Sequence, residues 1–485
     1  MIPFVGFAPD SPPETPGIFT DCKNILPSLG MFVAAPTPID CGLGAISGAA
    51  RGFAVTRKLD SSARVFCGSD TKLYEQSGGS WSDKSKSGNY TLGPDDSWRF
   101  AQFGNISIAA AKGATLQYID GGATFLDCSV SAPKAAIVET INNQVFVCDI
   151  NGMGFGDDVT RWACSALGSY TDWTPSVSTQ CVSGQLLDSP GPITAGKRLG
   201  DIMVMYKAKA MYVAEYVGAP QVWNVRRVPG DIGAPCNEAV IKTGTAHFFI
   251  GSDDFYVFDG SRPEPLNSPC RNWFFNNVNQ AYLYKTCGTF DYINQRIYWW
   301  FVSNSSAGGK LDKCIVYNVK SNQWGRMDCD IEYVADYVSS GLTYTTIGSA
   351  YATYNDLPTG ISYNSPFWTS GSSVIAYFKT DHKAYQMSGV AGESKITTGH
   401  YGDNMQFSTL NRIRPRFIQS PTNSSLSYSH SNTDASSFVT NLSSTYANNW
   451  YDLVWSARWH KMEFTYNGAM AISGFDPILS PDGVE

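Results

Sequence analysis

Charged side chains are scarce in this sequence. Lys and Arg number 35 and Asp and Glu 42, so charged residues make up 16% of the 485 positions, against about a quarter in an average soluble domain. The net charge of -7 excludes a globally cationic nucleic-acid binder, because such a domain has a high isoelectric point. Too few Glu and Lys remain to cover long amphipathic helices, whereas 45 glycines and 13% aromatic residues favour short strands and many turns. The composition therefore predicts an all-β protein.

Residue types that usually carry catalysis or bind metals are also few. The sequence has no phosphate-binding loop, no nucleophile elbow and no zincin motif. Twelve cysteines form no C-x-x-C pair, and we interpret them as buried free thiols rather than a disulfide framework. We expect no enzymatic activity, no cofactor and no metal site. The five histidines show no metal-ligand spacing and are expected to be structural: His247, His382, His400, His430 and His460.

Long apolar runs are missing as well. No window approaches the roughly 18 consecutive apolar residues that a membrane-spanning helix requires. The N-terminal stretch MIPFVGFAPDSPPETPG lacks the basic and apolar regions of a signal peptide. The sequence therefore predicts no membrane span and a protein that is cytosolic when it is synthesised.

What the sequence does contain is a recurring strand–turn–strand pattern. In HFFIGSDDFYVFDGSRPEPL, which begins at His247, two aromatic and β-branched runs flank a Gly-Ser-Asp-Asp turn. The related stretches begin at residues 65, 106, 145, 202, 247, 296 and 374, and the last interval leaves room for an unrecognised copy or an insertion. Periods of about 40 to 50 residues are typical of β-propeller blades. We predict a propeller of six or seven blades, with a β-sandwich of coincidental hairpin spacing as the alternative.

The two ends of the chain depart from this repeat. Residues 1–50 contain eight prolines before residue 39, and we predict an extended proline-rich docking arm that is ordered only where it docks. The β-propeller is expected to occupy residues 51–395. Residues 396–485 show alternating segments such as WYDLVWSA, which predict a small, separate β-sandwich.

A propeller that processes or binds glycans is an alternative that the sequence leaves open. The fragment YIDGGATF, which ends at Phe125, approaches the Asp-box of sialidase-like propellers, but that box is a turn brace and carries no activity. The adjacent pairs Asp95-Asp96, Asp157-Asp158 and Asp253-Asp254 are interpreted as turn residues, since neighbours on a strand point to opposite faces. A receptor-binding propeller would expose aromatic side chains, but Trp299-Trp300 lies within IYWWFV and is expected in a strand core.

One segment near the C-terminus carries three alternating arginines. Arg412, Arg414 and Arg416 are separated by single apolar residues, which places the three guanidinium groups on one face of a strand. Such a stripe suits contacts with phosphates or an acidic partner, and the alternative is a solvated face. These three residues are our candidate assembly or phosphate contacts.

Several segments resemble the tail nozzle or tail-hub proteins of short-tailed bacteriophages, a family that includes packaged-DNA stabilisation proteins. The first is the proline-rich SPPETPGIFTDCKNILPSLGMF, and the second is GDIMVMYKAKAMYVAEYVG followed by HFFIGSDDFYVFDGSRPEPL. The C-terminal LNRIRPRF and SARWHKMEFTYNG, before GFDPIL, complete the set. The resemblance spans most of the chain and matches the family in order and texture more than in identity.

This resemblance implies a structural subunit of a phage tail. In that family a β-propeller and a β-sandwich form each subunit, and a homo-oligomeric ring, expected to be a hexamer, extends the DNA channel below the portal and adaptor. The ring retains the packaged genome until ejection, so the implied localisation is the virion, after assembly in the host cytoplasm. The implied partners are adaptor or portal-side proteins, tail fibres or a plug or needle, and double-stranded DNA that passes through the lumen without sequence-specific binding.

Overall fold

A computed structural model describes residues 1–77, 79–154, 156–340, 353, 370–433 and 437–482. Strands dominate this part of the chain, and the all-β prediction is confirmed. The helical segments are the short η1 (Asn237–Ala239), α1 (Arg271–Asn277) and η2 (Gln280–Lys285). No helix among the described residues is long and apolar enough to cross a membrane.

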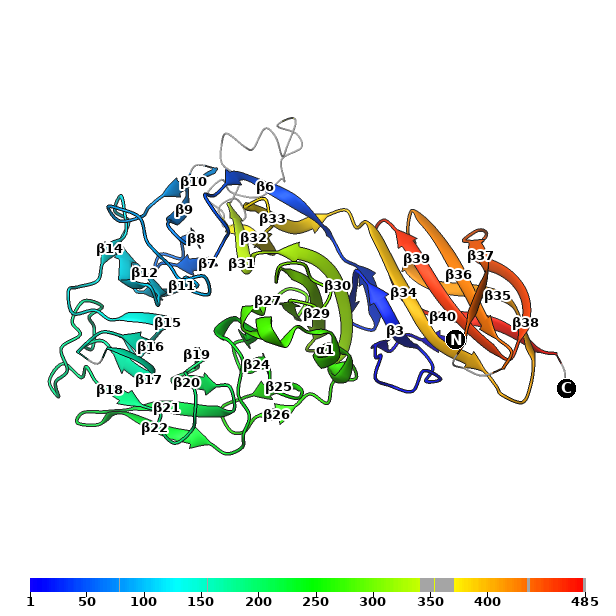
Figure 1. The fold of residues 1–485 in the computed structure, drawn as a ribbon. Helices are drawn as coiled ribbons and strands as arrows, with labels where there is room; N and C mark the ends of the chain where they lie inside the picture. Colours follow the sequence, from blue (N-terminus) through cyan, green and yellow to red (C-terminus); the bar gives the residue numbers. More distant parts are fainter. Residues whose placement is uncertain (78, 155, 341–352, 354–369, 434–436, 483–485) are drawn as a thin grey trace.

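Seven groups of four strands form a β-propeller, which Figure 1 shows as a ring. Blade 1 consists of β7 (Gly52–Arg57), β8 (Ala63–Gly68), β9 (Leu73–Ser77) and β10 (Ser80–Asp83), and blade 2 of β11 (Arg99–Phe103), β12 (Ile106–Ala111), β13 (Ala114–Ile119) and β14 (Leu126–Asp127). Blade 3 consists of β15 (Lys134–Ile141), β16 (Gln144–Asn151), β17 (Asp157–Cys164) and β18 (Ser183–Gln185), and blade 4 of β19 (Ala195–Leu199), β20 (Ile202–Lys207), β21 (Ala210–Gly218) and β22 (Val222–Val228). Blade 5 consists of β23 (Val240–Lys242), β24 (His247–Ile250), β25 (Phe255–Phe258) and β26 (Glu264–Pro265), and blade 6 of β27 (Cys287–Asp291), β28 (Arg296–Phe301), β29 (Leu311–Asn318) and β30 (Gln323–Ile331). Blade 7 consists of β31 (Tyr333–Ser340), β32 (Ser370–Phe378) and β33 (Lys383–Gly389), and β6 (Thr37–Ala45) is its fourth strand.

The first strand of every blade contacts the first strands of both neighbouring blades, so the ring closes around one axis. Four blades are separate four-stranded sheets. Blades 2 and 3 share one sheet through the single pair Thr115–Lys134, and blade 6 continues into a second body through the pair Arg326–Ile25. Blade 7 is closed by β6, which pairs with β33 across nearly the whole length of the chain.

The predicted repeat corresponds to the blades. All seven repeat starts fall in or at the beginning of the second strand of a blade: β8, β12, β16, β20, β24, β28 and β32. Each copy was expected to supply two strands of a blade, and these are the second and third strands. The long last interval includes residues 341–352 and 354–369, which lie outside the described residues, and the strands on either side of it, β31 and β32, pair within blade 7.

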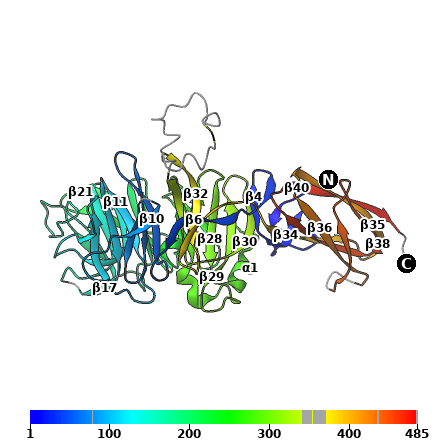
Figure 2. The same cartoon turned by 90° about the horizontal axis from the view of Figure 1, so that it is seen from above.

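A β-sandwich lies beside the propeller (Figures 1 and 2). Its first sheet has the order β4 (Ile25–Ser28), β5 (Met31–Ala34), β40 (Ala471–Pro481), β35 (Ser408–Gln419) and β38 (Tyr451–Ala457), with β1 (Ile2–Pro3) beside β40. Its second sheet has the order β2 (Gly6–Phe7), β3 (Ile18–Lys23), β34 (Glu393–Gly402), β39 (Trp459–Asn467), β36 (Asn423–Ser431) and β37 (Val439–Thr445). All of these pairs are antiparallel except the parallel pair of β2 and β3.

The N-terminal residues belong to both bodies rather than to a separate arm. Strands β1 to β5 complete the sandwich, whereas β6 completes blade 7. The expected division of the chain at residue 50 thus differs from the architecture, in which the sandwich combines strands from residues 2–34 with strands from 393–481. The prolines did not prevent pairing, because Pro3, Pro27 and Pro38 lie within strands that still find antiparallel partners.

Separate apolar clusters fill the spaces between neighbouring blades, and a larger cluster joins the propeller to the sandwich. The larger cluster includes Phe255 of blade 5, Trp299 of blade 6, and Phe32 and Phe475 of the sandwich. Trp299 and Trp300 are both fully buried, which confirms that they are strand core. The shared core and the shared sheet hold the two bodies together as one unit.

Candidate functional site

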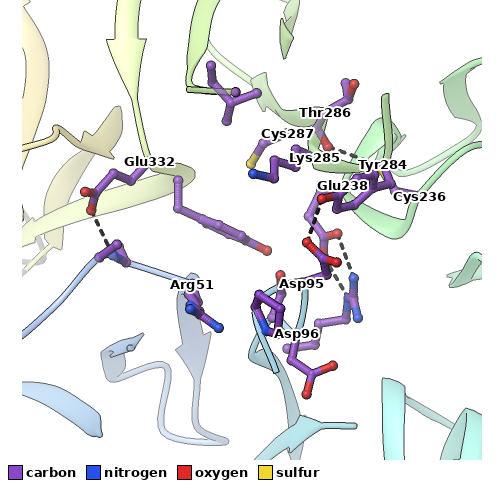
Figure 3. A pocket seen from close by; sticks show the side chains of 18 of the residues that line it. Arg51, Asp95, Asp96, Cys236, Glu238, Tyr284, Lys285, Thr286, Cys287 and Glu332 are labelled. Carbon is purple, nitrogen blue, oxygen red and sulfur yellow. Dashed lines mark hydrogen bonds and ion pairs between the residues drawn. The ribbon is translucent and has the colours of Figure 1, made fainter. Parts of the chain in front are cut away.

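Two cavities lie along the axis of the propeller and form the candidate site. The larger has a volume of ≈ 640 Å³ and is lined by the segments that lead into the first strands of all seven blades (Figure 3). The smaller has a volume of ≈ 310 Å³ and is lined by residues further along these strands. Three side chains, Arg99, Glu238 and Tyr333, line both cavities. We call the larger cavity the upper bowl and the smaller one the lower chamber.

An ion pair across the axis separates the two cavities. Arg99 starts β11 of blade 2 and Glu238 lies in η1 before blade 5, so blades 3 and 4 separate them along one side of the ring. Arg99 Nε and Nη2 donate to the two oxygens of Glu238, at 2.9 Å each, and Arg99 Nη1 donates to the carbonyl of Ala136 in blade 3. Both side chains are largely buried. This axial bridge lies between the two cavities, since Arg99 and Glu238 line both of them.

The bridge is electrostatically well matched. Burial alone would raise the pKa of Glu238, but the charge of Arg99 and its hydrogen bonds outweigh burial and lower that pKa to about 2. The pKa of the Arg99 guanidinium is raised by the same partner, against the effect of its burial. Bidentate geometry of this kind is the strong form of the arginine–carboxylate contact. Both groups therefore stay charged over the whole physiological range.

The carboxylates of the upper bowl have local partners. Asp95 accepts from the Tyr284 hydroxyl at 2.6 Å (Figure 3). Glu332 lies 2.7 Å from Nδ1 of His382. Asp149 accepts from Lys112 at 2.9 Å. Burial raises the pKa values of Glu332 and Asp149, a property that structural ion pairs share with catalytic acids. The geometry therefore favours structural contacts, within blade 7 for Glu332 and between blades for Asp95 and Asp149, over a reactive pair of carboxyl groups.

The lower chamber carries more cations than carboxylates. Its cations come from blades 1, 2, 4 and 5: Arg57, Arg99, Lys197 and Lys242. Its carboxylates come from blades 3, 5 and 7: Glu139, Glu238 and Asp336. Glu139 accepts from Lys242 at 2.9 Å, as Glu238 does from Arg99. Lys197 points into this set without such a contact among the described residues.

No sequence motif marks the axial residues. Arg99 opens the short strand RFAQF, and Glu139 and Lys197 lie beside apolar residues within KAAIVETI and AGKRL. A charge within an otherwise apolar strand is the one signal that could have marked them, because it must face water or a partner. That they meet on one axis follows only from closure of the ring.

The three predicted arginines share a face of β35, as expected from their spacing. Arg412 and Arg414 are exposed and Arg416 is half-buried, while the residues between them are buried. Each has a local neighbour: Arg412 lies 2.6 Å from Asp452, Arg416 pairs with Asp476, and Arg414 lies over the Trp450 ring. Their role in assembly or phosphate binding stays a prediction.

Other sequence predictions are met in part. All twelve cysteines are free and ten are buried. Asp120 accepts from the backbone of Gly122 in the Asp-box-like turn, and Asp95-Asp96 and Asp253-Asp254 lie in turns or bends. The pair Asp157-Asp158 was also expected in a turn, but it opens the strand β17. Asp158 is held there by hydrogen bonds from Arg161 and Gln185.

Two of the three buried histidines, His247 and His460, act as structural hydrogen-bonding groups. His247 Nε2 lies 3.1 Å from the Arg198 carbonyl, so this nitrogen carries the proton and Nδ1 accepts from the Tyr206 hydroxyl at 2.8 Å. In the sandwich, His460 bridges the hydroxyls of Tyr428 and Ser408 at 2.6 and 2.9 Å. Among the residues that the structure describes, no group of His, Cys, Asp and Glu has the arrangement of a metal site.

Acidification from pH 7 to pH 5 is expected to lower the free energy of unfolding by about 2 kcal/mol for each of His247 and His460. Burial lowers the pKa of His247 and of His460 to about 4, whereas histidine in an unfolded chain titrates near about 6.5. The unfolded state therefore takes up protons first, and stability present above pH 6.5 or so is lost as the pH falls toward 4. Urea denaturation at both pH values should show a smaller loss for His460→Gln than for the wild type. Equal losses would contradict the expectation.

Comparisons with known proteins concern the propeller fold. No family model matches the chain, and no curated protein matches it. Similar solved structures include the Pan2 WD40 domain of Neurospora crassa, with 6% identity, coverage of 74% of this chain and 96% of that chain, and a TM-score of 0.41. YCF48 from Cyanidioschyzon merolae has 9% identity, coverage of 73% and 98%, and a TM-score of 0.37. AztD of Citrobacter koseri has 11% identity, coverage of 76% and 93%, and a TM-score of 0.38.

At such identities and scores the similarity carries no argument about function. What the sheets and the closed ring establish is the class of the fold. The chain is an all-β protein built on a β-propeller.

Proposed function

We propose that the chain is a structural subunit of a bacteriophage tail, a nozzle or hub component that forms a homo-oligomeric ring below the portal and adaptor. The proposal is supported by the positions of three segments that carry the sequence resemblance. TDCKNILPS lies in and around β3 and β4, LNRIRPRF in β35 and WHKMEFTYN in β39. These strands are far apart in sequence and belong to one sandwich. These three segments of the resemblance therefore lie in one body, while the other two lie in blades 4 and 5 of the propeller. The meeting of the three in one sandwich supports a common role in assembly.

The closed axis of the propeller bears on the path of DNA. The major groove of B-DNA alone is about 12 Å wide, whereas the tunnel consists of cavities of ≈ 640 and ≈ 310 Å³ separated by the Arg99–Glu238 bridge. A duplex does not fit through the propeller of a single subunit. In the proposed ring, double-stranded DNA passes through a lumen that several copies enclose together, and the genome is retained there until ejection.

Replacing Arg412 and Arg414 together with alanine is expected to weaken incorporation into tails while the chain stays folded. Both guanidinium groups are exposed on the outer face of the sandwich, and exposed ion pairs contribute little to stability. Arg416 is kept, because it is half-buried against Asp476. Incorporation is measured by immunoblotting purified particles, and folding by the urea midpoint of the purified variant.

The matched control is Arg226→Ala with Arg227→Ala, an equally exposed pair on the outer strand β22 of blade 4. This control should assemble normally. Normal incorporation of the Arg412/Arg414 variant, or an equal loss in the control, would remove the arginine face from the proposal.

The proposal as a whole is tested by immunogold electron microscopy of purified phage particles with an antibody to this chain. Label confined to the distal end of the tail supports a nozzle or hub. Unlabelled particles, with the protein soluble in the lysate, would refute it. The glycan-processing and receptor-binding alternatives would then be compared by assaying hydrolysis and binding of surface glycans.

A further inference from the structure

The ammonium group of Lys197 lies inside the propeller and has no hydrogen-bond or ion-pair partner among the described residues. Lys197 is the third residue of β19 and lines the lower chamber together with Arg99, Glu139, Glu238 and Lys242. Its Nζ makes no hydrogen bond or ion pair with any residue that the structure describes, although a lysine ammonium has three donors. Burial lowers the pKa of Lys197, and the neighbouring Lys242 and Arg99 lower it further, against the attraction of Glu238 and Glu139.

The two neighbouring carboxylates, Glu238 and Glu139, already accept hydrogen bonds from other cations. Both oxygens of Glu238 accept from Arg99, and Oε1 also accepts from the Asn237 amide at 3.2 Å. Glu139 Oε2 accepts from Lys242 and from the backbone of Arg198, at 2.9 and 3.4 Å. With these two pairs neutralised, the chamber keeps Lys197 and Arg57 against Asp336 alone. The lining is therefore cationic, and Lys197 is the less exposed of its two cations, Lys197 and Arg57, that have no hydrogen-bond or ion-pair partner among the described residues.

We propose that the lower chamber is a binding site for a small oxyanion, of the phosphate or carboxylate class, with Lys197 as its anchor. A cavity of ≈ 310 Å³ accommodates a ligand of this size. The anion provides the hydrogen-bond acceptor that Lys197 lacks and offsets the repulsion among Lys197, Lys242 and Arg99. Because the axial bridge closes the other side, the ligand enters from the face opposite the upper bowl. This site is independent of the proposed role in a phage tail.

The test is isothermal titration calorimetry of the full chain with inorganic phosphate, with acetate as a second arm and with ionic strength held constant by chloride. We expect one site per chain, and we expect Lys197→Met to weaken binding by about tenfold or more, as loss of a charge-assisted hydrogen bond implies. Lys197→Arg keeps the charge and should retain binding. The matched control is Lys209→Met, which removes an exposed lysine from the turn that follows the next strand of the same blade.

Thermal unfolding gives a second readout, the Tm, which does not require a binding constant to be measured. Saturating phosphate should raise the Tm of the wild type, of Lys197→Arg and of the Lys209→Met control, because a ligand that binds only the folded state stabilises it. The ligand-free Lys197→Met protein should melt at or above the wild-type temperature, since an uncompensated ammonium has been removed. Preference for acetate over phosphate would identify the ligand as a carboxylate. Equal binding by Lys197→Met and the wild type, or no binding of either anion, would overturn the proposal.

Discussion

Replacing Arg99 with alanine is expected to lower the free energy of unfolding by about 3–5 kcal/mol, because it leaves the buried carboxylate of Glu238 without its partner. The two guanidinium hydrogen bonds to Glu238 and the bond to the Ala136 carbonyl disappear together. The loss is measured by urea denaturation at pH 7. The deficit relative to the wild type should shrink on acidification toward pH 4, because burial raises the pKa of Glu238 once Arg99 is absent and the folded state can then protonate this carboxylate.

Two further variants make this result specific to the axial bridge. Arg99→Met combined with Glu238→Met should cost less than Arg99→Ala alone, because an apolar pair leaves no unpaired charge. Arg226→Ala breaks an ion pair with Glu215 whose side chains are 44% and 42% exposed, and it should change stability by no more than about 1 kcal/mol. If Arg99→Ala is as mild as Arg226→Ala, the bridge does not hold the blades together.

Replacing Trp299 with alanine is expected to cost about 3–5 kcal/mol, the range for removing a large buried aromatic side chain. Trp299 is fully buried in the cluster shared by blade 5, blade 6 and the sandwich, and its rings contact Phe255 and Trp324. Because this cluster joins the two bodies, the loss should appear in one cooperative transition measured by both fluorescence and circular dichroism. Two separate transitions would show that propeller and sandwich unfold independently.

The neighbouring Trp300 provides a matched comparison. Both indoles are fully buried, but Trp299 Nε1 donates to the Ala239 carbonyl at 3.0 Å, whereas Trp300 Nε1 has no partner among the described residues. Trp299→Phe leaves a carbonyl unsatisfied, while Trp300→Phe removes an unsatisfied donor. We therefore expect Trp299→Phe to be the more destabilising by about 1–2 kcal/mol. A reversed order would contradict this account.

The repeat was readable from the sequence because it is local. Two strands and the turn between them lie within some 20 residues. The second strand is rich in buried apolar residues in blades 1 to 6, as RIYWWF in β28 illustrates. The first strands were not recognised, because strands such as β23, with only the three residues Val240–Lys242, carry too little pattern. The sandwich at the C-terminus was expected, but the contribution of residues 2–34 was not, since pairing of Cys22 with Ile396 leaves no local signal.

The candidate site was much less predictable. Arg99 and Glu238 are 139 positions apart, and each is an ordinary charged residue in its own segment. What makes them neighbours is the closure of seven blades around one axis, a long-range property of the ring. The arginine stripe, by contrast, depends only on strand alternation, and the sequence therefore placed Arg412, Arg414 and Arg416 on one face correctly.

Closure of blade 7 by β6 has a consequence for synthesis on the ribosome. Residues 37–45 are made well before their partner strand β33, residues 383–389. At about 5–20 residues per second, the interval is roughly 20–70 s. For this time the nascent ring has an open seam and β6 is an unpaired edge. The one proline and two glycines of TPIDCGLGA make β6 a poor template for pairing with another chain. The same strand that closes the ring therefore resists pairing with a wrong neighbour.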